Sequence, residues 1–197
     1  MGRRAGGRLR GVGCRLAGPA MSMLLVLATI GDASAVSAAE IAPEYQIKAA
    51  FLYKFGSYVE WPKGSSESGQ SSFTIAVIGA DDLVGYLSRM VKDRMVGGKP
   101  VVVRRLRPGA VPAGIQVLFI GRAAQEDTAS ILASVRNEPV LTVTESSRTE
   151  SAGGVINFVI VDNRVRFDVA LSSARRRNLK ISSRLLEVAR RVSGRTS

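Results

Sequence analysis

The sequence has no histidine, and its 197 residues include a single cysteine, Cys14. Histidine is the commonest general base and metal ligand, so its absence excludes hydroxyl–imidazole triads and leaves zinc with poor ligands. Cys14 precedes the first apolar run, in a segment that we expect to be removed. The mature chain then has neither a thiol nucleophile nor a disulfide. We predict no metal, no cofactor and a fold that its hydrophobic core alone stabilises.

Long hydrophobic runs are scarce as well. The clearest one extends from Met21 to Ile30, which is well short of the roughly 20 residues that a membrane-spanning helix needs. Five arginines precede this run, and small residues around Ala38 and Ala39 follow it. This order is typical of a secretory signal peptide. We predict that residues 1–39 are such a peptide, cleaved near Ala38 or Ala39, and that residues 40–197 form one soluble exported domain.

Phosphate-binding loops are also missing. The sequence contains neither G-x-x-x-x-G-K-[ST] nor a G-x-G-x-x-G that follows a strand. Asp81 and Asp82 follow the first predicted strand, where open α/β sheets place their sites. Adjacent residues at a helix start point in different directions, however, and an aspartate there is usually a cap. The sequence gives no support to an enzyme, and we predict a protein without catalytic activity.

The positive charge is placed unevenly. The formal net charge is +12, and residues 164–197 alone contain ten basic residues against Asp168 and Glu187. Such a basic segment would ordinarily suggest nucleic acid, but export argues against that partner. Three interpretations of this basic segment remain open. It could be a solvated basic helix face, or it could contact anionic membrane headgroups or an acidic protein partner.

Short apolar strands alternate with helices through the middle of the chain. A first helix is predicted from Pro43 to Trp61, ended by Pro62. Its apolar positions are Ile47, Ala50, Phe51, Phe55, Tyr58 and Val59. Strands are predicted over 73–79, 99–106, 116–121 and 140–145, with helices over 80–93 and 123–137. This alternation favours an α/β fold, a three-layer sandwich around a mainly parallel sheet.

The carboxyl-terminal part has a different pattern. Two strands flank Asp162-Asn163 and predict a β-hairpin with a tight turn. Two C-terminal helices follow, the first closed near Asn178 and the second capped by Ser182. The second helix should bury a stripe that consists of Leu185, Val188, Ala189 and Val192.

Two separated motifs resemble those of one family. The segment "YQIKAAFLYKFGSYVEWP" is similar to the opening motif of the YfiR-like family of periplasmic regulatory proteins, and "GGVINFVIVDNRVRFDVALSSARRRNLKISSRLLEVA" is similar to its closing motif. The resemblance extends over residues 44–192. It implies a non-enzymatic regulator that binds the periplasmic domain of an inner-membrane signalling protein, a diguanylate cyclase or sensor kinase. Repression of a cyclase would lower cyclic di-GMP, and relatives suggest a homodimer.

Aromatic residues and arginine are enriched at protein-binding hot spots. The candidates for partner or ligand contact are therefore Tyr45, Lys48, Tyr53, Tyr58, Trp61, Arg184, Arg190 and Arg191. Against this, the aromatic residues could pack in the core, and Lys48 and Lys54 could be solubilising charges on the polar side of the first helix. The alternative function is a ligand-binding sensor module, with a crevice at the carboxyl ends of strands 73–79 and 116–121.

Overall fold

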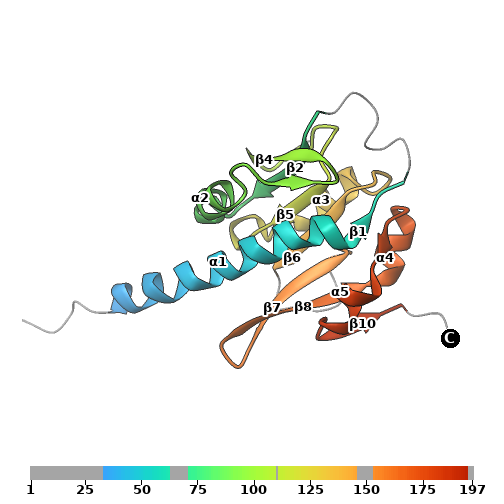
Figure 1. The fold of residues 1–197 in the computed structure, drawn as a ribbon. Helices are drawn as coiled ribbons and strands as arrows, with labels where there is room; N and C mark the ends of the chain where they lie inside the picture. The colour runs from blue at the N-terminus through green and yellow to red at the C-terminus, as the bar shows by residue number, and fades with distance from the viewer. Residues whose placement is uncertain (1–32, 63–70, 110, 146–152, 195–197) are drawn as a thin grey trace, which may run out of the picture.

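The computed structural model describes residues 33–62, 71–109, 111–145 and 153–194, so most of the predicted signal peptide lies outside the described residues. Figure 1 shows the arrangement of the helices and strands. In chain order they are α1 (Ala33–Tyr58), β1 (Val59–Glu60), β2 (Phe73–Ile78), α2 (Asp81–Met90), β3 (Met95–Val96), β4 (Lys99–Leu106), β5 (Val117–Ile120), the 3-10 turn η1 (Arg122–Ala124), α3 (Thr128–Ser134), β6 (Leu141–Glu145), β7 (Ile156–Val161), β8 (Arg164–Ala170), α4 (Leu171–Arg176), β9 (Lys180–Ile181), α5 (Ser183–Glu187) and β10 (Arg191–Ser193).

One large sheet organises the fold. Its strand order is β10-β8-β7-β6-β5-β2-β4-β3. The central strands β4, β2, β5, β6 and β7 run parallel to one another, and among the described strands of this sheet only β7–β8 and β3–β4 pair antiparallel. The predicted α/β class, the mainly parallel sheet and the carboxyl-terminal hairpin are therefore confirmed.

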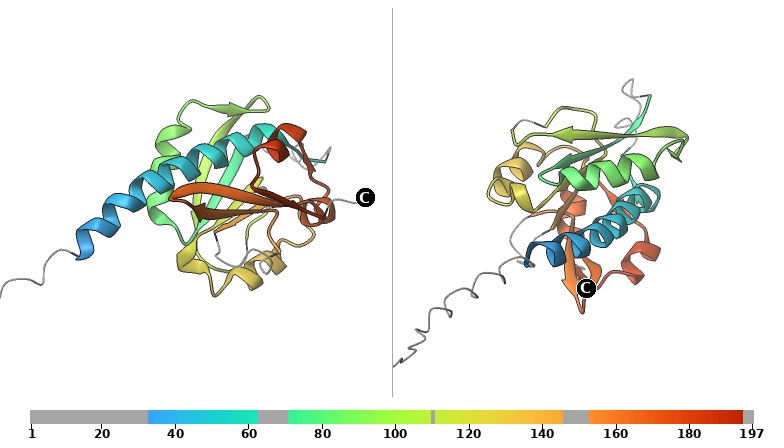
Figure 2. Two further views of the ribbon diagram at one scale, coloured as in Figure 1. Left: turned by 90° about the horizontal axis from the view of Figure 1, so that it is seen from below. Right: turned by 90° about the vertical axis from the view of Figure 1, so that its left-hand side faces the viewer.

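The two faces of the sheet bury separate sets of side chains. In β2, Ile75 and Val77 pack in the cluster beneath α1 and α2, while Ala76 and Ile78 pack against α3 on the other face. This alternation follows from the two-residue period of a strand. Figure 2 shows α1 and α2 on one side of the sheet and α3 on the other. Helices thus lie on both faces of the β2–β5 half, whereas a three-layer sandwich over the whole sheet stays a prediction.

The first helix is longer than the sequence predicts, and its buried face is different. It begins at Ala33, so that Pro43 lies inside it, and its first turns project beyond the sheet (Figure 1). Removal of a leader after Ala39 would leave Glu40 first and place Pro43 within the first turn, where proline is tolerated. The helix ends at Tyr58 instead of Trp61, because the next two residues pair with β9.

The buried stripe of α1 is rotated relative to the predicted one. Its buried positions are Tyr45, Lys48, Ala49, Leu52 and Phe55, which lie on one face of the helix, and Val59 of β1 is buried as well. Phe55 is in the core as predicted, but Ile47 is 45% exposed. The placement of Ile47 in the buried stripe is therefore wrong, and so is that of Lys48 on the polar side.

The last predicted helix is replaced by two shorter elements. Helix α5 ends at Glu187, and Arg191–Ser193 form β10, which pairs parallel with β8 at the sheet edge. The predicted stripe through Val192 is consequently wrong, and Val188 is 62% exposed. The backbone N–H of Arg190 donates to the Phe167 carbonyl at 2.9 Å, which turns the chain from the helix onto the sheet edge.

The β7–β8 turn provides a local test of the hairpin. Asp162 and Asn163 join the strands with φ values of 48° and 57°, the left-handed pair that a type I′ turn requires. We expect Asn163→Gly to raise the free energy of unfolding by about 0.5 kcal/mol, because glycine adopts this φ without strain. We expect Asn163→Ala to lower it by about 1 kcal/mol. Urea denaturation measures both, and two changes of the same sign would contradict the assignment.

Candidate functional site

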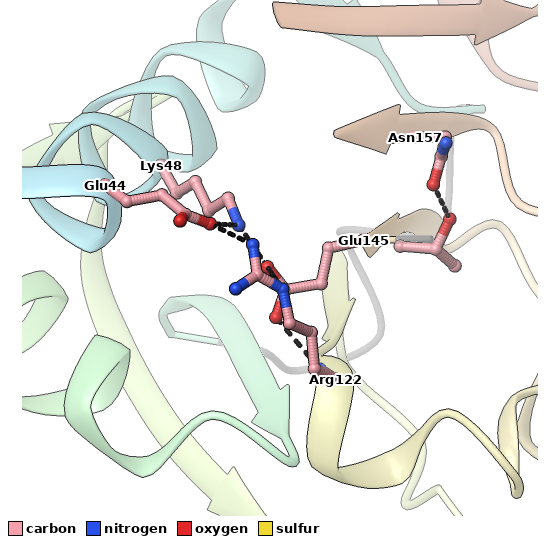
Figure 3. A network of polar contacts seen from close by, with 6 residues as sticks. Glu44, Lys48, Arg122, Glu145 and Asn157 are labelled. Atoms are coloured by element: carbon pink, nitrogen blue, oxygen red, sulfur yellow. Dashed lines mark hydrogen bonds and ion pairs between the residues drawn. The ribbon is translucent and has the colours of Figure 1, made fainter. Parts of the chain in front are cut away.

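A charge network joins α1 to the carboxyl ends of two parallel strands (Figure 3). The Lys48 ammonium group contacts Glu44, one turn earlier on α1, and Glu145, the last residue of β6. Arg122, the first residue of η1, contacts Glu44 through its guanidinium group and donates its backbone N–H to Glu145 Oε1 at 2.9 Å. Two cations and two carboxylates thus alternate across three elements.

The centre of this network is sealed from solvent. The side chain of Lys48 is 1% exposed and that of Glu145 is 2% exposed. The Lys48 nitrogen also lies 5.4 Å from the centre of the Tyr45 ring and 5.9 Å from that of Phe158, within the range of cation–π attraction. Burial, together with the charge of Glu145, raises the pKa of Tyr45 to about 12. Tyr45 and Lys48 therefore act inside the protein, where they position α1 on the sheet.

Sequence reasoning missed Glu44, Arg122 and Glu145. A signal for the network existed in α1, because Lys48 follows Tyr45 by three residues and precedes Leu52 by four, in step with the buried stripe. A lysine at a core position needs a buried carboxylate. Nothing local in the sequence indicates that Glu145 supplies it from 97 positions away.

The segments that follow β2 and β5 are in close backbone contact. The N–H of Gly121 donates to the Ile78 carbonyl at 2.7 Å, and that of Ala123 donates to the Gly79 carbonyl at 3.2 Å. A Cβ atom on Gly121 would lie 2.4 Å from the Gly79 oxygen. The carboxyl ends of these two strands are thus in direct contact, and a ligand crevice at these ends stays a prediction.

The remaining aromatic candidates are half-buried and lie toward the end of α1. The Tyr53 hydroxyl is 3.5 Å from the Met95 carbonyl. Trp61 packs edge-to-face on Phe73 of β2, with the ring centres 5.4 Å apart, and its buried Nε1 has no hydrogen-bond partner among the described residues. Tyr58 is partly buried against the core cluster. Each of these three side chains is therefore partly packed against the core and partly exposed to solvent.

The three arginine candidates have different surroundings. Arg184 on α5 and Arg191 on β10 are exposed. Arg190 instead forms a two-pronged ion pair with the buried Asp168, with Nε 2.7 Å from Oδ1. That hydrogen bond raises the pKa of Arg190 above its usual value. Arg190 therefore fixes the carboxyl-terminal segment to β8, whereas Arg184 and Arg191 present their charges to solvent.

The fold brings the two sequence motifs together. Val59 pairs with Ile181 and Glu60 with Lys180 in the β1–β9 ladder, and the Ser182 N–H donates to the Tyr58 carbonyl at 2.9 Å. We call Tyr58, Trp61, Lys180 and Arg184 the motif junction. It brings partly exposed aromatic residues and two exposed cations into neighbouring segments, although more than 100 residues separate them in sequence. This composition suits protein recognition.

Comparison with protein families matches residues 45–190 to the family described as YfiR/HmsC-like. The chain belongs to this family. Members of the YfiR/HmsC-like family are periplasmic, regulatory rather than catalytic, and act through contact with a membrane signalling protein. Comparison with curated proteins gave no match.

Two structural observations accompany this YfiR/HmsC-like assignment. Over the described residues, no helix is both long and apolar enough to cross a membrane. Within the same parts of the chain, no three acidic, cysteine or histidine side chains gather as a metal site would require. The match also includes both halves of the motif junction, so the feature that the fold assembles lies within the family domain.

Proposed function

We propose that this protein is a periplasmic repressor, which binds the periplasmic domain of an inner-membrane diguanylate cyclase and thereby lowers cyclic di-GMP. The family match over residues 45–190 carries the proposal. A protein of this kind shifts its partner between active and inactive states only by its differential affinity for them. The contact surface is therefore the part of the molecule where function should be sought.

The motif junction is the surface that we assign to this contact. Tyr58 and Trp61 offer amphipathic rings that are already partly ordered by packing, so little side-chain entropy is lost on binding. Arg184 and Lys180 add exposed positive charge that would steer an acidic partner surface. We assign no partner contact to Lys48 and Arg190, because their charges already pair with Glu145 and Asp168 within the protein. Tyr45 is buried, and we assign it no partner contact either.

Deletion of the gene is expected to raise cellular cyclic di-GMP severalfold, and the wild-type copy should restore it. Tyr58→Ala and Arg184→Ala should each weaken co-purification of the membrane partner at least about tenfold, as truncation of a hot-spot residue does. Tyr86→Ala, at a half-buried tyrosine on α2, and Arg89→Ala are matched controls that should retain binding. Unchanged cyclic di-GMP after deletion would rule out the cyclase, and capture of a sensor kinase would replace it as the partner.

A further inference from the structure

A polar pocket of about 300 Å³ lies between the carboxyl-terminal half of the sheet and α4. Thr144 of β6, Asn157 of β7 and Asp168 of β8 line it. Their neighbours Val143, Phe158 and Phe167 belong to the cluster beneath α1, so the pocket opens on the opposite face of the sheet. The polar lining also includes Ser172, Ser173 and Arg176 of α4 and Arg191 and Ser193 of β10.

The pocket has an excess of positive charge. Its single carboxylate, Asp168, is already neutralised by the two-pronged pair with Arg190. Arg176 donates to the Ser173 hydroxyl at 2.9 Å, which aims its guanidinium along the pocket wall. The Arg191 side chain forms no hydrogen bond or ion pair with any described residue. Two arginine side chains and several hydroxyl groups therefore face the same space without a matching anion.

We propose that this pocket binds a small soluble anion through a carboxylate or phosphate group. A planar guanidinium donates two parallel hydrogen bonds to such a group, and two guanidinium groups from different elements can clamp it. On the sheet side of the pocket, the Thr144 hydroxyl donates to Asn157 Oδ1 at 2.8 Å. The volume suits a metabolite-sized ligand rather than a polymer.

Ligand binding would also strengthen one edge of the fold. Strand β10 pairs with β8 through only three residues, and the guanidinium of Arg175 contacts the Gly194 carbonyl beyond its end. An anion held by Arg191 and Arg176 would join this edge strand to α4. Binding to the native state alone raises its apparent stability. This inference does not rest on a cyclase partner, because it concerns a different face of the molecule.

The test is calorimetric titration of the purified exported protein with inorganic phosphate and, separately, with succinate at constant ionic strength. We expect saturable binding of at least one probe. Arg176→Gln and Arg191→Gln should each raise its Kd at least about tenfold, the loss of one charge-assisted hydrogen bond. Arg184→Gln removes the same charge outside the pocket and should change Kd less than about twofold. Circular dichroism checks that each variant is folded.

Hydrogen exchange supplies a second measurement on the wild-type protein. The bound anion should slow exchange of the β10 amides, residues 191–193, and leave those of β3 unchanged. Absence of saturable binding by both probes below about 10 mM would overturn the proposal, as would equal weakening in all three variants. Phosphate binding without succinate binding would identify a phosphorylated ligand, and the reverse would identify a carboxylic acid.

Discussion

Replacement of Lys48 by methionine is expected to lower the free energy of unfolding by about 3 kcal/mol. Methionine fills a similar volume, so the loss would come from charge. Glu145, whose side chain is 2% exposed, would lose its ammonium partner while remaining inside the protein. A buried carboxylate without its cation typically costs about 3 to 5 kcal/mol. We expect a cost at the lower end of this range because the backbone N–H of Arg122 still donates a hydrogen bond to the Glu145 carboxylate in the variant.

Chemical denaturation of Lys48→Met, Lys54→Met and the double variant Lys48→Met/Glu145→Gln would measure this effect. Lys54 is exposed on the same helix, and its replacement should change stability by less than about 0.5 kcal/mol. The double variant removes both charges and should recover at least about 1 kcal/mol relative to the single variant. A loss in Lys48→Met no greater than that in Lys54→Met would show that the network does not stabilise the fold.

Substitution of Gly121 by alanine should destabilise the protein by about 3 kcal/mol, the upper range for overpacking. The added Cβ would lie 2.4 Å from the Gly79 oxygen and 2.7 Å from the Ala80 Cβ. The Gly79 oxygen is a backbone atom, and the Ala80 Cβ is bonded directly to the backbone. No side-chain rotation can therefore relieve the contact. The φ of Gly121 is −85°, which alanine adopts readily, and the expected loss is therefore purely steric.

The same substitution at Gly85 is the matched control. Gly85 lies within α2, and its added Cβ would meet only the end of the Arg89 side chain at 3.5 Å. Alanine there should raise the free energy of unfolding by about 0.5 to 1 kcal/mol through helix propensity. Thermal denaturation compares the two variants. Equal midpoints would mean that the close contact between the β2 and β5 ends is absent in solution.

Most strands were predictable because their signals are local. The apolar runs at 73–79, 99–106, 116–121 and 140–145 all form strands, and the sheet is mainly parallel as their alternation with helices indicates. The short strands β1, β3, β9 and β10 were not predicted. Each of these strands has two or three residues, which is too short to show an alternating hydrophobic pattern in the sequence. Each forms because another strand lies beside it.

The candidate site was only partly predictable. Tyr58, Trp61 and Arg184 were candidates by residue type, and the fold groups them in the motif junction. Lys48 and Arg190 were candidates for surface contact, yet each forms an ion pair with a buried carboxylate. Spacing along a helix does not distinguish a solvated lysine from a paired one, because the deciding carboxylate comes from a distant strand.

The sequence by itself determined the class of fold, the family and the absence of imidazole chemistry. Each of these depends on composition or on a pattern within about 20 neighbouring residues. Only the tertiary structure decided which side chains are buried, which charges pair, and that the two motifs meet at β1 and β9. These properties depend on contacts between segments that lie up to 122 residues apart in the sequence, such as Val59 and Ile181.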